Sequence, residues 1–253
     1  MHNDTIQPAP PPLVTDAVPQ PVAPWPHTVA LFVVLIASAL LGQQRAAGIA
    51  NGGTHWYRYG STVMLSWLLL GSVVAGVYHR GAFFAAALRN RASTWAHEAG
   101  IGVAVYLCGM LTLALVGGLT QLTPLRHKRN EAVVLAMLPH TPLEFVLWLL
   151  LSMTAGFCEE LIFRGYLLQQ FTAWTRRPVL AVILSSAIFG AVHLYEGVGA
   201  MLPLMALALL FGFIARQRKG DLRAVMIAHA LQDFLVAILA LAQPWLSHRL
   251  PHP

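Results

Sequence analysis

The chain alternates between long apolar runs and short polar segments. A membrane-spanning helix needs about 20 mostly apolar residues, and most of the runs approach or exceed this length, so the pattern predicts membrane helices. Seven spans are expected, at about 27–43, 60–79, 99–119, 142–174, 179–194, 198–215 and 222–242. A further apolar piece at 132–138 is too short to span, but counting 131–141 as a span would make eight.

Two segments outside the apolar runs, residues 1–26 and 80–97, have distinctive compositions. Residues 1–26 contain eight of the sixteen prolines and no Lys or Arg, which predicts a disordered tail rather than a signal peptide. Residues 80–97 interleave Phe, Leu and Trp with three arginines. This is typical of a helix lying in the membrane interface, with a solvated loop helix as the alternative.

These boundaries divide the chain into four parts. We expect a proline-rich tail at 1–26, an N-terminal membrane part at 27–142, a core at 143–243 and a short C-terminal tail at 244–253. A polar loop is expected at 43–59. Pro244 is expected to close the last helix, because proline cannot continue a regular helix.

Composition supports a polytopic membrane protein. Hydrophobic residues make up 57% of the chain and charged residues 10%, whereas soluble domains carry about 25% charged residues. The net charge of +6 comes from Lys and Arg between the apolar runs, as is usual around membrane segments, so no nucleic-acid partner is expected. More of these residues fall on the side of the N-terminus, which favours a cytoplasmic N-terminus. The expected fold is all-α: a polytopic membrane bundle of about seven, or eight, transmembrane helices.

The two cysteines, Cys108 and Cys158, both lie inside apolar segments. They give neither a disulfide framework nor a zinc-binding pattern. Cys158 precedes two glutamates, but a nucleophilic role is disfavoured because apolar burial makes a thiol less reactive.

Ionisable residues inside the fourth apolar run are the first candidates for chemistry. Glu159 and Glu160 are adjacent, and a charge near the bilayer centre costs about 3 kcal/mol on insertion scales. Glu160 and Arg164 are four apart, so they share a helix face and can pair. Glu159 lies about 100° round the helix, and we expect it to point into a cavity and to handle protons or water. The Glu160–Arg164 pair alone would be equally consistent with a structural ion pair.

Two later apolar runs also contain ionisable residues. His193 ends the motif Phe189-x-x-x-His193, and His229 and Asp233 share one face of the last helix. A single membrane histidine is more often a hydrogen-bonding residue between helices, and His229 with Asp233 could be a packing pair. Gathered in one wet cavity, however, all these groups would satisfy one another.

The ordered set Glu159-Glu160-x-x-x-Arg164, Phe189-x-x-x-His193 and His229-x-x-x-Asp233 resembles the motifs of the CPBP family. This family comprises the type II CAAX prenyl proteases and the bacteriocin-processing or self-immunity proteins, also called Abi-type intramembrane proteases. The resemblance covers about residues 143–243.

The resemblance implies a glutamate-dependent intramembrane endopeptidase with a conical catalytic cavity, in a family that is labelled metalloprotease. Glu159 would be the general base that activates water, and His193 would hold that water. Glu160 would be the second carboxylate, oriented by Arg164. This agrees with the chemistry, since amide hydrolysis needs a base, a positioned water and donors where negative charge develops.

The resemblance also implies that His229 and Asp233 line the opposite wall, near the developing oxyanion. The family motif often ends in Asn, and an ionised Asp cannot donate to an oxyanion. Asp233 would therefore be protonated, orient His229 or bind a metal. His193, His229, Asp233 and Glu159 would together suit zinc, but no His-Glu-x-x-His signature is present, so zinc stays open as a cofactor.

Two other classes of function remain open from the sequence. One is a proton-coupled transporter, since membrane carboxylates and histidines also form proton relays, although no inverted repeat is visible. The other is a catalytically silent immunity or scaffold protein on the same fold. The expected partners are the lipid bilayer and a membrane-associated peptide or protein substrate, and the expected location is a prokaryotic inner membrane.

Overall fold

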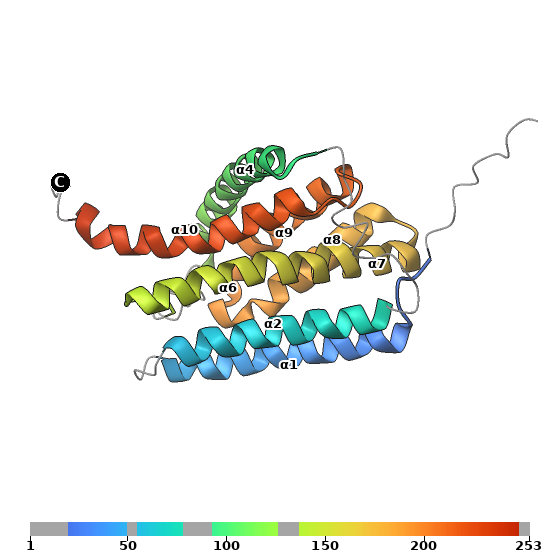
Figure 1. Cartoon of the computed structure of the whole chain (residues 1–253), viewed down its shortest axis with the longest axis horizontal. Helices are drawn as coiled ribbons and strands as arrows, with labels where there is room; N and C mark the ends of the chain where they lie inside the picture. Colours follow the sequence, from blue (N-terminus) through green and yellow to red (C-terminus); the bar gives the residue numbers. More distant parts are fainter. Residues whose placement is uncertain (1–19, 50–54, 78–92, 126–136, 248–253) are drawn as a thin grey trace, which may run out of the picture.

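The computed structural model describes residues 20–49, 55–77, 93–125 and 137–247, and within these ranges the chain forms helices and no strands (Figure 1). Expectations for the proline-rich tail, for most of the interfacial segment 80–97 and for an eighth span at 131–141 lie largely outside these ranges. The helices, in order, are α1 (Trp25–Ile49), α2 (His55–Val77), α4 (Trp95–Gln121), α6 (Pro142–Glu160), η3 (Leu161–Leu167), α7 (Leu168–Thr175), α8 (Pro178–Val192), η4 (Leu194–Glu196), α9 (Val198–Gln217) and α10 (Arg223–Ser247).

Helices occupy all seven apolar runs, which confirms the predicted all-α membrane bundle. Within the described ranges, four segments are long and apolar enough to cross a membrane: Trp56–Val77, Trp95–Gln121, Pro142–Thr175 and Val198–Gln217. This number is lower than the seven spans predicted. Helix α8 shows one reason, because its 15 residues extend only about 22 Å at 1.5 Å per residue, which is shorter than the apolar thickness of a bilayer.

Two predicted boundaries are wrong. The segment 43–59 is predicted as a polar loop, but α1 continues to Ile49 and α2 begins at His55. Its Gln, Arg and Ala residues are polar or small but are good helix formers. Pro244 is predicted to end the last helix, but α10 continues to Ser247, as membrane helices tolerate proline.

The helices pack as a sequence of neighbours around α6. Helix α6 lies between α2 and α10; α10 packs on α4, α4 on α9, α9 on α8 and α8 on α7. Figure 1 shows α1 and α2 together along one side and α4 on the opposite side. The segment α6–η3–α7 is thus the central rod of the bundle, and its carboxylates lie where several helices meet.

Local sequence defines both ends of this central rod. Thr141 caps α6 in a capping box with Glu144, and Pro142 occupies the first turn, where a missing N–H costs nothing. At the other end Arg176 adopts a left-handed conformation with φ of 54°. The rod therefore ends at Thr175, directly before the Arg176-Arg177-Pro178 sequence.

A small residue sets the spacing between α6 and α10. A Cβ atom added at Gly156 would lie 2.7 Å from the carbonyl oxygen of Met226 and 2.8 Å from the amide nitrogen of Ala230, both in α10. These distances are shorter than real Cβ contacts allow, so only glycine permits this approach. The approach occurs one turn before the two glutamates and brings α10 within hydrogen-bonding reach of them.

The start of α1 is held against the central rod by buried polar side chains. Gln170 accepts from the backbone N–H of Val22 at 2.8 Å and donates to the carbonyl of Ala23 at 2.9 Å. The hydroxyl of Tyr166 lies 2.8 Å from both His27 and Thr28. Residues about 140 positions apart are thereby joined, and α1 is fixed beside η3 and α7.

Candidate active site

Glu160 and Arg164 form an ion pair inside the bundle. Arg164 Nη1 donates to Glu160 Oε1 at 2.8 Å, and their side chains are 2% and 0% exposed. The guanidinium of Arg164 also lies 4.7 Å from the ring centroid of Phe189. The predicted pairing is therefore confirmed, and it connects the first motif to the second.

Residues 161–167 are wound as a π-helix directly after the two glutamates. Such segments are rare and are frequent at functional sites. Nothing in the sequence pattern predicts this change of winding. All seven residues of the segment are buried, so the carboxylates stand at the start of a rigid, tightly packed section.

His229 joins the pair from α10. Its Nδ1 lies 2.8 Å from Glu160 Oε1, while its Nε2 lies 3.9 Å from Glu159 Oε2 and 3.6 Å from Asp233 Oδ2. Glu160 Oε1 thus receives both Arg164 and His229. The first and third motifs meet at this point, which is what the ordered set of motifs predicts.

Glu159 differs from its neighbour in exposure and in partners. Its side chain is 26% exposed, and among the residues that the structure describes its Oε2 has no hydrogen-bond partner, although this atom is buried. Leaving a buried acceptor unpaired costs about 1–3 kcal/mol. The protein thus maintains one carboxylate that is not committed to another side chain.

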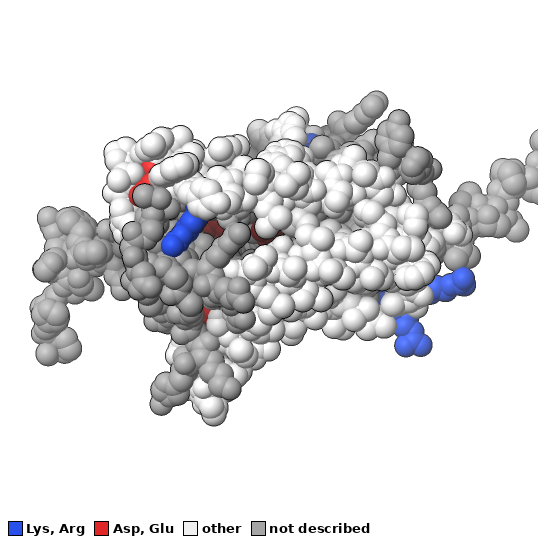
Figure 2. All heavy atoms as spheres, turned by 90° about the horizontal axis from the view of Figure 1, so that it is seen from below, with Lys and Arg blue, Asp and Glu red and all other residues white. Residues whose placement is uncertain are grey.

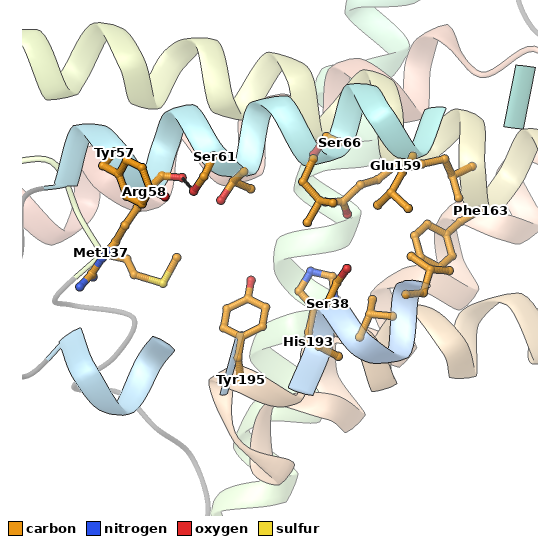
Figure 3. Close-up of a pocket in the computed structure, with 17 residues that line it drawn as sticks. Ser38, Tyr57, Arg58, Ser61, Ser66, Met137, Glu159, Phe163, His193 and Tyr195 are labelled. Atoms are coloured by element: carbon orange, nitrogen blue, oxygen red, sulfur yellow. Dashed lines mark hydrogen bonds between the residues drawn. The ribbon is translucent and has the colours of Figure 1, made fainter. Parts of the chain in front are cut away.

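Glu159 opens onto a cavity of about 480 Å³. The walls come from α1, α2, the α6–η3 junction and the connection after α8, and Figure 3 shows Glu159, His193 and Tyr195 around it. Figure 2 shows a largely uncharged face with a hollow at whose depth acidic atoms are visible. The prediction that Glu159 points into a cavity is confirmed, whereas the conical shape of that cavity stays a prediction.

His193 lies at the same cavity, just after the end of α8. Its Nδ1 donates to the carbonyl of Phe189 at 2.8 Å, and the two rings lie 4.6 Å apart. Because a carbonyl can only accept, the proton is on Nδ1, and in the neutral ring Nε2 carries a lone pair. The second motif therefore supplies a fixed hydrogen-bond acceptor on the wall of the cavity that Glu159 also lines.

Asp233 and His229 are not among the residues that line the cavity. Asp233 faces His229 at 3.6 Å, and its backbone carbonyl accepts from Trp148 Nε1 at 3.0 Å. Of the three roles open for Asp233, this geometry favours orientation of His229. A direct role for either residue at an oxyanion stays a prediction.

The residues named for zinc do not form a ligand cluster. Within the described ranges, no three His, Cys, Asp or Glu side chains lie close enough together to hold a metal ion. His229 Nε2 lies 3.9 Å from Glu159 Oε2 and 3.6 Å from Asp233 Oδ2, and two ligands that each lie about 2 Å from one ion can be this far apart. A complete ligand set is not assembled among the described side chains, so zinc stays a prediction.

Several cavity residues escaped prediction from the sequence. Tyr195 follows His193 by two positions, Ser38 lies in α1, and Arg58 and Ser66 lie in α2. Tyr195 could have been found from its closeness to the second motif, but the others resemble ordinary polar residues of membrane helices. Cys158 is fully buried and is not a cavity residue, so the structure gives it no nucleophilic role.

Comparison with known families agrees with this geometry. Residues 141–235 match the family model described as type II CAAX prenyl endopeptidase Rce1-like. The match contains every ionisable residue of the three motifs and confirms the CPBP resemblance for this segment. No curated protein and no solved structure matches the chain. The family is one of intramembrane proteases, and with the apolar helices it identifies an integral membrane protein.

Proposed function

We propose that this protein is an intramembrane endopeptidase in which Glu159 activates water to hydrolyse a peptide bond. The observation that supports this most directly is the contrast between two adjacent carboxylates. Each has one buried oxygen without a hydrogen-bond partner among the described residues. The other oxygen of Glu160 is held by Arg164 and His229, whereas Glu159 is the carboxylate that lines the cavity. A general base needs such an uncommitted oxygen within reach of its water.

The first step transfers a proton from water to Glu159. His193 Nε2, with its proton fixed on Nδ1 by Phe189, accepts the second hydrogen of the same water and orients it. The resulting hydroxide attacks the carbonyl carbon of the substrate, and a tetrahedral oxyanion forms. Glu159 then returns its proton to the leaving nitrogen, so that the C–N bond breaks and a carboxylic acid and an amine are released.

The oxyanion requires a hydrogen-bond donor that the acidic residues do not provide. Tyr195 is the candidate on the cavity wall, because Figure 3 shows its hydroxyl directed into the cavity toward helix α2. Preorganised donors of this kind stabilise tetrahedral intermediates. Glu160, Arg164, His229 and Asp233 act as positioning residues that hold the helix bearing Glu159.

The cavity fits a membrane-associated peptide or protein segment. Its lining includes Leu35, Leu65, Leu69, Ile162 and Val192 as well as hydroxyl groups. Such a lining accepts apolar side chains together with a peptide backbone. A prenylated CAAX-like terminus is the substrate class that the family description names, and for this chain it is part of the proposal.

The test uses the full-length protein in nanodiscs with a library of quenched fluorescent peptides. Wild type is compared with Glu159→Gln and His193→Ala, and Glu144→Gln is the matched control. Glu144 is in the same helix, and Gln can preserve the capping box at that position. We expect cleavage by wild type and by Glu144→Gln, and loss of cleavage in the two site variants.

Two results would contradict the proposal. Equal cleavage by wild type and Glu159→Gln would remove Glu159 as the base. Binding of a natural partner that is unchanged by Glu159→Gln, without cleavage of that partner by wild type, would instead favour a silent scaffold protein. Chelator treatment of wild type, followed by zinc, tests separately for a metal that the described residues do not assemble.

A further inference from the structure

His27 fills a slot between the two N-terminal helices and the central rod. Its ring meets the ring of Tyr166 in η3 edge-on, with centroids 5.6 Å apart. A Cβ atom added at Gly76 of α2 would lie 2.4 Å from the imidazole, so a larger residue at this position would displace the ring. His27 and Gly76 lie before the segment that matches the family model, whereas Tyr166 lies inside it. The slot therefore joins the N-terminal part of the chain to the helix that carries the motif glutamates.

The hydrogen bonds around His27 run in one direction. His27 Nε2 lies 2.8 Å from the carbonyl oxygen of Ser72, which can only accept, so the proton is on Nε2. In the neutral ring, Nδ1 then accepts from the hydroxyl of Tyr166 at 2.8 Å. This hydroxyl in turn accepts from Thr28 at 2.8 Å, and Thr28 accepts from Gln170 at 3.1 Å. Every donor in this His27 network has an acceptor.

A proton on His27 would break the order of the network. The charged ring donates from both nitrogens, so Tyr166 would have to turn its own hydrogen toward Thr28. The hydrogen of Thr28 would then lose its acceptor within the network. The described groups against the ring are a phenol from η3 and a carbonyl and a glycine from α2, and they include no carboxylate to offset the positive charge. The network therefore suits the neutral ring.

We infer that His27 is a positioning residue for the proposed reaction: its neutral ring holds α1 and α2 on η3, and its protonation releases them. The inference rests on the proposed function, because it concerns the same site. Leu35, the first cavity residue of α1, is eight residues from His27, about 12 Å along a helix. Tyr166 follows Glu159 by seven residues on the rod. One ring thus orients both a wall of the cavity and the helix that carries the base.

The position of α1 is measured first, because this readout does not depend on activity. The full-length protein in phosphatidylcholine nanodiscs carries spin labels at Ile36→Cys of α1 and Met153→Cys of α6, two exposed positions. Cys108→Ser removes the exposed native thiol, and Cys158 is fully buried. Double electron–electron resonance gives the distribution of distances between the labels. The distribution should about double in width between about pH 7.5 and about pH 5, the range in which histidine changes its charge.

Two changes at His27 separate its protonation from loss of the ring. Asn can accept from Tyr166 but takes up no proton in this range, so His27→Asn should give a narrow distribution at both pH values. His27→Ala should give a broad one at both. The matched control is His97→Asn, at an exposed histidine of α4, which should broaden at low pH as the labelled parent protein does.

Three results would overturn the inference. They are a distribution in the parent protein that does not change with pH, a change that persists in His27→Asn, and a change that His97→Asn removes. If His27→Ala does not fold, the comparison of the parent protein with His27→Asn still decides.

Cleavage by the unlabelled protein gives the second readout. The ratio of kcat/KM between wild type and His27→Asn should fall about tenfold from about pH 7.5 to about pH 5, because misplaced reacting groups slow the reaction. The ratio cancels the pH dependence of all groups that the two proteins share. A constant ratio with Glu159-dependent cleavage overturns the role of His27 and preserves the proposed function. Release of α1 at low pH without Glu159-dependent cleavage supports the control of α1 by His27 and overturns the proposed function.

Discussion

Two clusters of buried charge in the described part of the chain are organised in opposite ways. At one end of the bundle, Glu98 of α4 accepts from Ser93 and Arg218, and Asp221 accepts from Arg223 at 2.8 and 3.1 Å. All four carboxylate oxygens in this Glu98 cluster have a partner. In the other cluster, one oxygen of Glu159, which lines the cavity, and one of Glu160, which does not, have no hydrogen-bond partner among the described residues.

The difference separates charges that hold helices together from charges available for chemistry. The Glu98 cluster ties the start of α4 to the end of α9 and the start of α10, and Glu98 is 0% exposed. Its partners complete its hydrogen bonding, so it has nothing left to offer a substrate. An incompletely paired carboxylate at a cavity reduces stability, which is a common property of functional sites.

The largest expected effect is on activity alone. Glu159→Gln should lower cleavage by at least about a thousandfold, because it removes the general base. The free energy of unfolding should change by less than about 1 kcal/mol, because Oε2 has no hydrogen bond to lose among the described residues. Peptide cleavage and SDS titration in mixed micelles measure the two quantities. A large loss of stability would contradict this prediction and would show that Glu159 stabilises the fold, as Glu98 does.

Removing the partner of Glu160 should have a large effect on stability. Arg164→Met leaves a buried carboxylate without its cation, which costs about 3 kcal/mol or more. The same SDS titration measures this loss, with Arg177→Met as the control at an exposed position. Unchanged stability in Arg164→Met would show that Glu160 is neutral in the folded protein.

Tyr195→Phe tests whether the cavity contains an oxyanion donor. We expect kcat to fall about a hundredfold with KM nearly unchanged, because the hydroxyl acts only as charge develops. Steady-state kinetics on a cleaved peptide give both constants. A rise in KM at constant kcat would assign Tyr195 to substrate binding instead.

Glu98→Gln should have the reverse effect of Glu159→Gln. It weakens the hydrogen bonds to Arg218 and removes a charge near Arg223, and we expect a loss of about 2 kcal/mol in the free energy of unfolding. Activity per folded molecule should stay at the wild-type level. If cleavage falls while stability stays unchanged, the two clusters are not independent.

The smallest expected effect is the pH dependence of the stability that Asp221 contributes. Burial alone would raise the pKa of Asp221, but hydrogen bonds from Arg223 and its charge lower this pKa below the ordinary value. A lowered folded-state pKa gives stability that is present above the unfolded value of about 4 and is lost as pH falls through the folded value. Asp221→Asn should thus cost about 1 kcal/mol at pH 7 and progressively less below about pH 4.

Thermal unfolding of both proteins across this pH range, followed by tryptophan fluorescence, measures the difference. A constant difference between wild type and Asp221→Asn at every pH would contradict the lowered pKa.

Much of the arrangement of the motif residues could be predicted from the sequence. A charged side chain in an apolar helix must either pair with another charge or face a cavity. The spacing of Glu160 and Arg164 predicts their pairing, and the position of Glu159 about 100° away predicts its separate environment. Both were confirmed. The functional roles of these residues stay predictions, since geometry alone does not show a reaction.

The features that the sequence did not predict depend on contacts between residues far apart in the chain. Local sequence patterns give no information about such contacts. The π-helix at 161–167 has no signature in its apolar sequence. Glu98 lies at the junction between a predicted interfacial segment and a predicted span, so nothing marks it as buried. The contribution of α1 and α2 to the cavity depends on how they pack on α6, and Ser38 or Arg58 alone gives no sign of it.

The hydrogen bonds between Gln170 and the backbone before α1 have a consequence for biosynthesis. The first helix leaves the ribosome about 140 residues before its partner exists, a delay of about 7–30 s at 5–20 residues per second. Since α1 forms one wall of the cavity, that wall can close only after Tyr166 and Gln170 have been made. The cavity therefore cannot be complete until synthesis has passed Gln170.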